Sequence, residues 1–284
     1  MKPFEAAIED FKIRSNPLLD DSQITLVATV KNETTFIPAF LEHYRALGVE
    51  RFVMLDDRST DGTFELLRAQ PDVMVIGSDH VYNTTVPVDD PEARRMLGRD
   101  AVSMHVMWKQ LMLARFCADR WAVLADLDEF LVLPPGYDLR RLFAELDAAE
   151  PCDAVAGAMI DCYPATVAEM AADTGAFRLD GRWLFDAVPH VRVDRSGDVR
   201  HEYNGARSRL SYQYLAAPRL SARLALWECL RLIRAALVPQ RRMFPRVSEI
   251  VKEPVLRWRE DAWVPSAQVT SLRKSMRHVL PGAH

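Results

Sequence analysis

Short apolar runs alternate with helical segments through the first half of the chain, and this alternation limits the fold more than any other feature. The apolar runs are rich in β-branched residues, as expected for strands that are buried on both faces. The runs cover residues 24–30, 51–55, 72–76 and 121–125, and helical segments are expected over residues 34–47, 63–69 and 101–118. Strands that alternate with helices predict βαβ units, so the expected fold class is α/β with a mostly parallel sheet flanked by helices.

Polar clusters directly follow the expected strands. They are Lys31-Asn32-Glu33, the segment 56–63, the long loop 77–100 and Asp126-Leu127-Asp128-Glu129. In parallel sheets ligands bind beyond the carboxyl ends of the strands, because loops and helix amino termini converge there. We therefore expect one functional site at that edge, built from side chains of separate segments.

The carboxylates of Asp126, Asp128 and Glu129 come directly after the fourth expected strand. Crowded carboxylates repel one another and are best neutralised by a divalent cation; hard oxygen ligands select Mg²⁺ or Mn²⁺, which also bind substrate phosphates. In an extended segment Asp126 and Asp128 point to the same side, while Leu127 and Phe130 can turn to the core. A solvated acidic turn is the alternative, and the position at the end of a buried strand favours the metal site.

The polar segment after the second expected strand has the residues of a turn that leads into a helix. Ser59 or Asp61 can cap that helix, and Gly62 permits a tight turn. Capping leaves Asp56 and Asp57 unexplained, since both lie at the strand end itself. A carboxylate there can accept hydrogen bonds from the imide N–H of a base and from a ribose hydroxyl. Both interpretations, the capping turn and the nucleoside contact, stay open on the sequence.

Composition and motif searches exclude several classes of protein. The formal net charge of −4 argues against a nucleic-acid binder, because phosphate neutralisation needs a basic face. Dinucleotide-binding, Walker-type, nucleophile-elbow and zincin motifs are absent from the sequence. The chain has no apolar run long enough for a spanning helix, no secretion signal and no Cys-x-x-Cys pair among its four cysteines. We therefore expect a cytoplasmic protein with reduced, buried thiols.

A set of sequence blocks follows in a fixed order along the same half of the chain. They read Val30-Lys31-Asn32-Glu33, then Tyr44-x-x-Leu47-Gly48-Val49-x-x-Phe52, then Asp56-Asp57-x-Ser59-x-Asp61-Gly62-Thr63, then Asp126-Leu127-Asp128-Glu129-Phe130-Leu131. In order and spacing they resemble glycosyltransferase family 2 proteins. The resemblance implies a Rossmann-like GT-A fold and metal-dependent transfer of a sugar, with inversion, from a nucleotide-diphosphate sugar to a hydroxyl acceptor.

The resemblance also implies roles for single residues. Those expected to bind the nucleotide sugar are Asn32, Glu33, Asp56, Asp57, Asp126 and Arg207. Asp57 or its neighbour Asp56 would contact the base or the ribose. Asp126 and Asp128 would form an Asp-x-Asp motif that holds Mn²⁺ or Mg²⁺, and such a metal clamp stabilises the charge that leaves with the diphosphate.

The second half of the chain resembles a bacterial branch of the same family through shorter blocks. They are Met159-Ile160-Asp161-Cys162-Tyr163-Pro164, Phe185-Asp186, Gly205-x-Arg207-x-Arg209 and Lys252-x-Pro254-x-x-Arg257-Trp258. An inverting transferase needs a base for the acceptor hydroxyl. Asp161 ranks first for this role, because it follows the apolar run 154–160, and the other candidates are Asp186, Asp194 and Glu202.

Two interpretations stay open for each pair of basic residues in the second half of the chain. Arg207 and Arg209 either face the pyrophosphate or lie in a solvated loop. His190 and His201 are either metal or phosphate contacts or surface histidines.

The expected organisation is an N-terminal extension over residues 1–21, a GT-A-type catalytic domain over 22–210, and a helical, basic C-terminal appendage over 211–284. Residues 219–246 carry seven arginines against one glutamate, together with apolar residues at helical spacing. Such a helix either binds an anionic membrane surface, where a glycan or lipid-linked acceptor would lie, or packs its apolar face on the catalytic domain.

Other functions fit the same acidic residues. A metal-dependent nucleotidyl- or phosphotransferase could use Asp126 and Asp128, but the sequence offers it no Gly-rich loop and no dedicated phosphate-binding lysine. A non-catalytic sugar-nucleotide-binding protein is the other alternative, because Gln268 stands where the bacterial branch often has a histidine.

Overall fold

The structure is a computed structural model of the chain that describes residues 11–17, 22–87, 91, 101–149, 154–158, 160–166, 168–169, 177–181, 183–185, 191–193, 199–201 and 251–257. The contacts among residues divide the chain into two compact units. The first unit contains the described parts of residues 1–156, 174–180 and 253–284, and the second contains those of residues 157–173 and 181–252.

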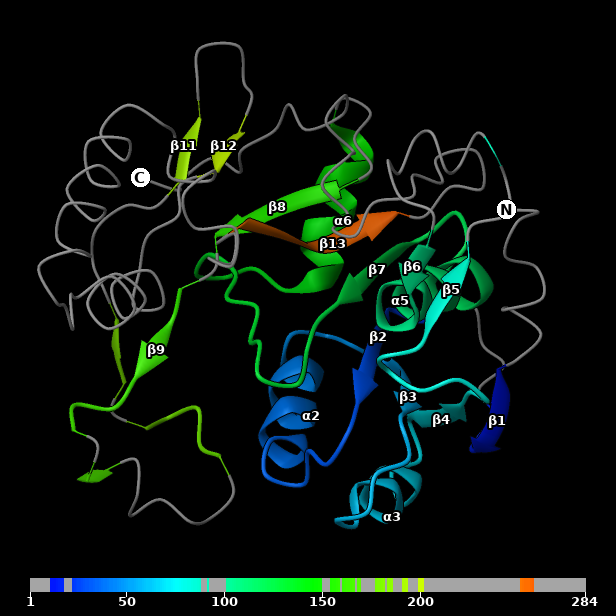
Figure 1. The fold of residues 1–284 in the computed structure, drawn as a ribbon. Coiled ribbons are helices and arrows are strands. Elements are labelled where there is room, and N and C mark those ends of the chain that lie inside the picture. Colours follow the sequence, from blue (N-terminus) through cyan, green and yellow to red (C-terminus); the bar gives the residue numbers. More distant parts are fainter. Residues whose placement is uncertain are drawn as a thin grey trace, which may run out of the picture. The chain divides into compact units, whose positions relative to one another are not determined.

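A seven-stranded sheet in the order β1-β4-β3-β2-β7-β13-β8 runs through the first unit (Figure 1). Its strands are β1 (Lys12–Ser15), β2 (Thr25–Val30), β3 (Arg51–Asp56), β4 (Val73–Gly77), β7 (Trp121–Leu124), β8 (Ala154–Ala158) and β13 (Val251–Arg257). Strands β4, β3, β2 and β7 are neighbours and parallel, whereas β1 and β13 pair antiparallel with β4 and β7. The α/β class and the parallel centre of the sheet are therefore confirmed.

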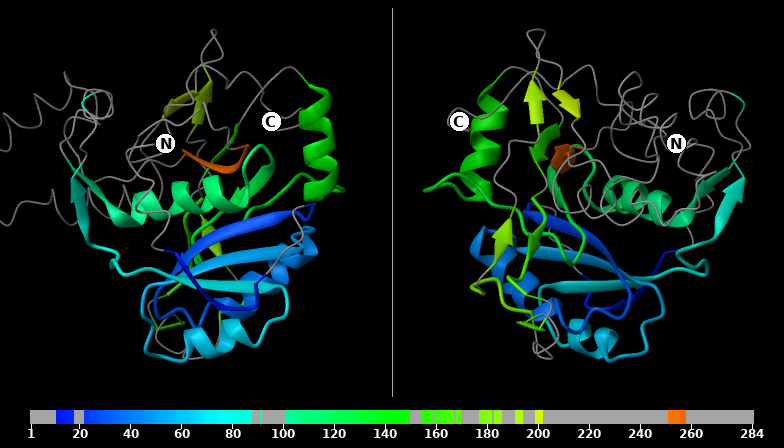
Figure 2. Two further views of the ribbon diagram at one scale, coloured as in Figure 1. Left: turned by 90° about the vertical axis from the view of Figure 1, so that its right-hand side faces the viewer. Right: turned by 60° about the vertical axis from the view of Figure 1, so that its left-hand side comes forward.

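Helices cover both faces of this sheet (Figure 2). One face packs against α2 (Ile37–Ala46), α3 (Thr63–Arg68) and α6 (Leu139–Ala148), and the other face packs against α5 (Met104–Phe116). Alternation along β2 shows why both faces are apolar: Leu26 and Ala28 join the first hydrophobic cluster, whereas Val27 joins the second. A strand with apolar residues at consecutive positions can thus pack against helices on both faces of the sheet.

The expected strands and helices of the first half agree with the structure to within a few residues, with a difference at the start of α5. Residues 101–103, which periodicity assigned to a helix, form the strand β6 (Ala101–Ser103), which pairs antiparallel with β5 (Thr85–Pro87). The prediction was wrong for these residues because Ser103 has an extended backbone, with φ −76° and ψ 137°, and the helix begins only at Met104.

Strands β1 and β13 and the helix α6 were not predicted from the sequence. β1 lies within the expected extension 1–21, and β13 lies within the expected helical appendage 211–284, whose residues 211–250 and 258–284 are outside the described parts. Helix α6 has a clear start signal, since the side chain of Asp138 accepts a hydrogen bond from the backbone N–H of Arg141 at 2.7 Å.

The second unit is described only in short antiparallel pairs. β9 (Cys162–Tyr163) pairs with β10 (Leu184–Phe185), and β11 (Val191–Val193) pairs with β12 (Val199–His201). The basic segment 219–246 lies outside the described residues, so neither interpretation of it is tested. Among the helices that the structure describes, none is both long and apolar enough to cross a bilayer.

The cysteines that the structure describes are both free thiols. Cys117 is buried, as expected, but Cys162 is exposed, so the expectation that every thiol is buried was wrong at that position. Cys152 and Cys229 lie outside the described residues.

A cluster of Trp121, Asp147 and Arg257 joins β13 to β7 and α6. The Asp147 carboxylate accepts a hydrogen bond from Trp121 Nε1 at 3.0 Å and forms an ion pair with the Arg257 guanidinium. The same guanidinium lies over the Trp121 ring, 4.7 Å from its centroid. The hydrogen bond from Trp121, and then the one from Arg257, lower the pKa of Asp147 against the opposing effect of burial. These contacts attach a strand from the far end of the sequence to the centre of the sheet.

We expect Arg257→Met to lower the free energy of unfolding by about 1–2 kcal/mol, because it removes a charge-assisted hydrogen bond and a cation–π contact. Urea denaturation would measure the change. The matched control is Arg140→Met, whose guanidinium is exposed and pairs with Glu50 at 2.9 Å, and we expect it to change the stability by less than about 0.5 kcal/mol. Equal losses in the two variants would contradict a special role for the Arg257 cluster.

Candidate functional site

The carboxyl ends of the parallel strands bring separate polar segments to one edge of the sheet. β2 and β3 pair in register from Thr25 with Arg51 to Val30 with Asp56, and β7 pairs with β2 from the other side. The loops that follow β2, β3, β4 and β7 therefore leave the sheet at the same edge. The predicted convergence of these segments is confirmed.

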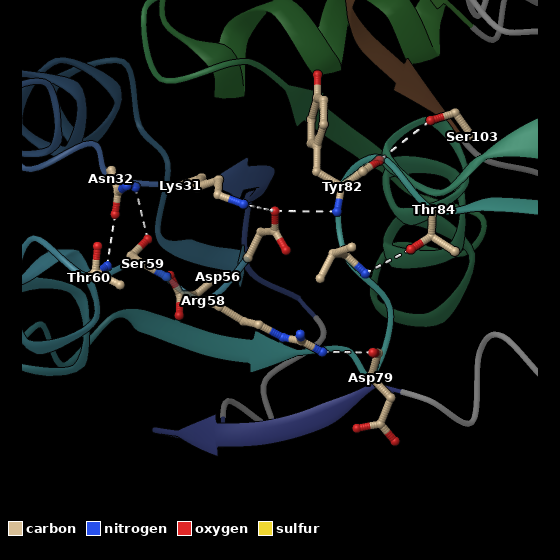
Figure 3. A network of polar contacts seen from close by, with 12 residues as sticks. Lys31, Asn32, Asp56, Arg58, Ser59, Thr60, Asp79, Tyr82, Thr84 and Ser103 are labelled. Carbon is tan, nitrogen blue, oxygen red and sulfur yellow. Dashed lines mark hydrogen bonds and ion pairs between the residues drawn. The ribbon is translucent and has the colours of Figure 1, made fainter.

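Asn32 holds the first two loops together. Its backbone adopts the left-handed conformation, with φ 56°, which asparagine tolerates better than most residues. The Asn32 N–H donates to Ser59 Oγ at 2.9 Å, and its side-chain carbonyl accepts from the Thr60 N–H at 2.8 Å (Figure 3). The side chain predicted to bind nucleotide is thus engaged in positioning the neighbouring loop.

Asp61 provides a further link between these loops. One carboxylate oxygen accepts from the Thr63 N–H at 3.0 Å at the start of α3, and the other accepts from the Thr34 hydroxyl at 3.0 Å. Burial acts to raise the pKa of Asp61, but hydrogen bonds from Thr63 and Thr34 outweigh it and lower the pKa to about 2. Gly62 follows with φ 94°, so the predicted turn is confirmed, but the N-cap of α3 is Gly62 itself and not Ser59 or Asp61, and Asp61 contacts the helix start through the Thr63 N–H.

Asp56 is fully engaged within the protein. Its Oδ2 accepts a hydrogen bond from Arg14 Nη1 of β1 at 2.9 Å, and its Oδ1 accepts from the Ser59 N–H at 3.2 Å. The side chain is buried. These bonds connect β3 to the edge strand β1 and shape the following turn, so Asp56 has a structural role that accounts for both of its oxygens.

Asp57 differs from its neighbour, because one of its oxygens has no partner. The side chain is only 2% exposed, and Oδ2 forms an ion pair with Lys31 Nζ at 2.8 Å and accepts from the Tyr82 N–H at 3.3 Å. Its Oδ1 is buried and accepts no hydrogen bond from any residue that the structure describes. A buried acceptor without a donor costs about 1–3 kcal/mol, and a ligand N–H or O–H could remove that cost. Of the two expected acids, Asp57 is therefore the one available to a ligand.

Tyr82 and His105 add an aromatic surface beside Asp57. Their rings stack with centroids 4.5 Å apart and an interplanar angle of 17°, and Tyr82 remains 41% exposed. Ser103 Oγ lies 2.7 Å from His105 Nδ1 and shares a hydrogen bond with it. Neither aromatic residue was predicted from the sequence, where the available signal was an aromatic residue in the polar loop that follows the third expected strand.

The segment 126–129 is a turn and not an extended strand. The Glu129 N–H donates to the Asp126 carbonyl at 3.0 Å, so the expectation that Asp126 and Asp128 share a side through strand alternation was wrong. Leu127 is buried, and Phe130 packs edge-on against Phe40 with ring centroids 6.3 Å apart. The expected anchoring of these two apolar side chains in the core is confirmed.

Lys109 of α5 forms an ion pair with Asp126, which the sequence analysis did not foresee. The contact joins Lys109 Nζ to Asp126 Oδ1, and the two side chains are 22% and 34% exposed. Asp128, two residues further along the turn, is exposed. The two carboxylates predicted to hold a metal thus have different surroundings.

The pKa of Glu33 is sensitive to the negative charges at this edge of the sheet. Burial is the largest cause that raises the pKa of Glu33 above its ordinary value, followed by the charges of Asp128, Asp61 and Asp126. Its backbone N–H donates to Thr63 Oγ1 at 2.8 Å. The effects on Glu33 place these acids from three different loops near one another, as the sequence predicted for the site as a whole.

The donor set suits a hard divalent cation that is shared with a ligand. Within the described residues, no three acidic, histidine or cysteine side chains are grouped closely enough to hold a metal by themselves. Mg²⁺ typically binds through one or two carboxylates and takes its other ligands from water and substrate phosphates. Asp126 and Asp128 are two carboxylates on one turn, which is the number that such a site needs, and a cation bound there would offset the charges that, after burial, raise the pKa of Glu33.

The acids and bases predicted in the second half are largely outside the described residues. Asp186, Asp194, Glu202, His190, Arg207 and Arg209 all lie there. Asp161 is described in the second unit, where it is half-buried and directly precedes β9. Burial, followed by the charge of Asp161, raises the pKa of the neighbouring Cys162 thiol. His201 lies in β12 opposite Val191.

No family model matches the chain, and no curated protein matches it.

Because Asp56 and Asp57 have different surroundings, we expect their substitution to change the free energy of unfolding by different amounts. We expect Asp56→Ala to lower the free energy of unfolding by about 2–3 kcal/mol, because it leaves Arg14 and the Ser59 N–H without their acceptors. Asp57→Asn keeps an oxygen for its present donors, and its effect should stay within about 1 kcal/mol. Denaturant unfolding of both variants tests this order, and a larger loss in Asp57→Asn would contradict it.

Proposed function

We propose that the protein is a GT-A-type glycosyltransferase that moves a sugar from a nucleotide-diphosphate donor to a hydroxyl acceptor. The proposal is supported by a parallel sheet whose strand-end loops gather carboxylates from β2, β3 and β7. Ligands of parallel α/β sheets bind at this edge. The resemblance of the sequence blocks to glycosyltransferase family 2 supplies the reaction class.

The unpartnered oxygen of Asp57 is the observation that carries the proposal. A nucleoside offers this oxygen a donor through an imide N–H or a ribose hydroxyl, while Lys31 pairs with the other carboxylate oxygen at 2.8 Å. The exposed ring of Tyr82, stacked on His105, gives the base an aromatic surface beside it. Asp57 and Tyr82 would then hold the nucleoside, and Asn32 would act by positioning the loop.

Asp126 and Asp128 are proposed as the protein ligands of Mn²⁺ or Mg²⁺. The bound cation would neutralise the negative charge that develops on the diphosphate as the glycosidic bond breaks. Glu33 lies near both acids and strengthens the negative field that attracts the cation.

Asp161 stays the proposed general base, with Asp186 as the other candidate, on the sequence pattern alone. The base would take the proton of the acceptor hydroxyl as its oxygen attacks the anomeric carbon. Arg207 is proposed to contact the diphosphate. The acceptor is proposed to be a glycan or a lipid-linked glycan, reached at the inner face of a membrane through residues 219–246.

The nucleotidyl- or phosphotransferase alternative gains one observation, because Lys109 lies beside Asp126 and is a candidate for the phosphate-binding lysine that this class needs. Incubation with a panel of sugar nucleotides and Mn²⁺ separates the alternatives. Release of free sugar and nucleoside diphosphate indicates a transferase, whereas cleavage between the phosphates indicates the second class. Binding without turnover indicates a non-catalytic sugar-nucleotide-binding protein.

We expect Asp128→Ala to abolish Mn²⁺-dependent binding of nucleoside diphosphates, and Asp57→Asn to weaken it by about tenfold or more, since each removes a contact to a charged group. Isothermal titration calorimetry with UDP, GDP, CDP and ADP would measure both. Asp79→Asn is the control, because Asp79 is an exposed acid that pairs with Lys12 of β1. The affinity of this variant for nucleoside diphosphates should equal that of the wild type. Unchanged affinity in both site variants would overturn the proposed function.

A further inference from the structure

Lys109 places a positive charge on a carboxylate that the proposed function assigns to a metal. The lysine lies in α5, on the sheet face opposite to α2, and its ammonium contacts Asp126 Oδ1 directly. Both side chains are largely but not fully shielded from water. In this arrangement Asp126 is neutralised by the protein itself, while Asp128 is exposed on the same turn.

A divalent cation and the Lys109 ammonium cannot share this carboxylate without cost, because both are positive and would lie within a few ångströms of each other. The lysine side chain has a flexible four-carbon stem, so its ammonium can leave Asp126 at little cost in strain. Burial, and then the charge of Lys109, lower the pKa of His105, which precedes Lys109 by one helical turn. These effects disfavour a positive charge on His105 beside the Lys109 ammonium.

We propose that Lys109 is a positioning residue that exchanges partners: it neutralises Asp126 in the free protein and moves to the diphosphate when a divalent cation takes over that carboxylate. The inference rests on the proposed function, because it needs a diphosphate ligand at this site. An ammonium binds phosphate as a compact point charge with three N–H donors, so the exchange replaces one anionic partner by another.

Because of this exchange, Lys109 should lower the affinity for Mn²⁺ alone and raise the affinity for the diphosphate. Removing the ammonium removes a cation that competes for Asp126 Oδ1, so Mn²⁺ alone should bind Lys109→Met more tightly, by about three- to tenfold, given the strength of partly exposed ion pairs. The same variant loses a charged contact to the diphosphate. Its affinity for the nucleotide at saturating Mn²⁺ should therefore fall by about tenfold or more. Replacement of a residue with a purely structural role would lower the affinity for both ligands or for neither.

The experiment uses the full chain and calorimetric titration of Mn²⁺ alone, followed by titration of the diphosphate from the UDP, GDP, CDP and ADP set that binds the wild type best. Lys109→Arg is the conservative variant, and it should stay closer to the wild type than Lys109→Met in both titrations. Arg140→Met is the matched control for loss of a surface cation far from the strand-end loops, and it should match the wild type. Thermal unfolding of each variant checks that the fold is kept.

A double-mutant cycle with Asp126→Asn separates the two effects of Lys109. Without the carboxylate, Lys109→Met should no longer raise the affinity for Mn²⁺, whereas the loss of nucleotide affinity should persist. Mn²⁺ affinity that is unchanged or lower in Lys109→Met, or nucleotide affinity that is unchanged, would overturn the exchange. Absence of both Mn²⁺ and nucleotide binding in the wild type would instead overturn the proposed function and remove the basis of the inference.

Discussion

Parallel pairing of β2 with β3 and β7 is the constraint on which the rest of the site depends. The register from Thr25 with Arg51 to Val30 with Asp56 lets these strands end at one edge, so loops distant in sequence leave the sheet side by side. Asn32 and Asp61 then connect the loops after β2 and β3 through hydrogen bonds from backbone N–H groups to side-chain oxygens. Loops held in this way can keep several carboxylates close together in spite of their repulsion.

Adjacent residues at the end of β3 have separate tasks because their side chains leave the backbone in different directions. Asp56 reaches β1 through Arg14 and the turn through Ser59, and both of its oxygens are used. Asp57 contacts Lys31 and Tyr82, and its other, buried oxygen has no donor within the described part of the chain. The same contrast holds at the next acidic turn, where Asp126 is paired with Lys109 and Asp128 is exposed. Asp56 and Asp126 are thus engaged by basic side chains of the protein. Asp57 keeps one oxygen, and Asp128 its whole side chain, for contact with a ligand.

Much of the first unit was predictable from local pattern. The apolar runs, the helix over residues 37–46 and the Asp61-Gly62 turn follow from periodicity and from turn chemistry, which depend on neighbouring residues only. The strands β1 and β13 could not be predicted in this way. Their pairing partners lie far away along the chain, and β13 is attached through the contacts of Arg257 with Trp121 and Asp147.

The sequence by itself determined the α/β class, the parallel centre of the sheet and the edge at which polar side chains gather, because strand and helix periods are local properties of the chain. Only the tertiary structure decided which of Asp56 and Asp57 has an oxygen to offer, and only it brought Lys109 to Asp126 and Tyr82 to Asp57. Hydrogen-bond satisfaction and charge pairing depend on distances between segments, and those distances exist only once the sheet has assembled.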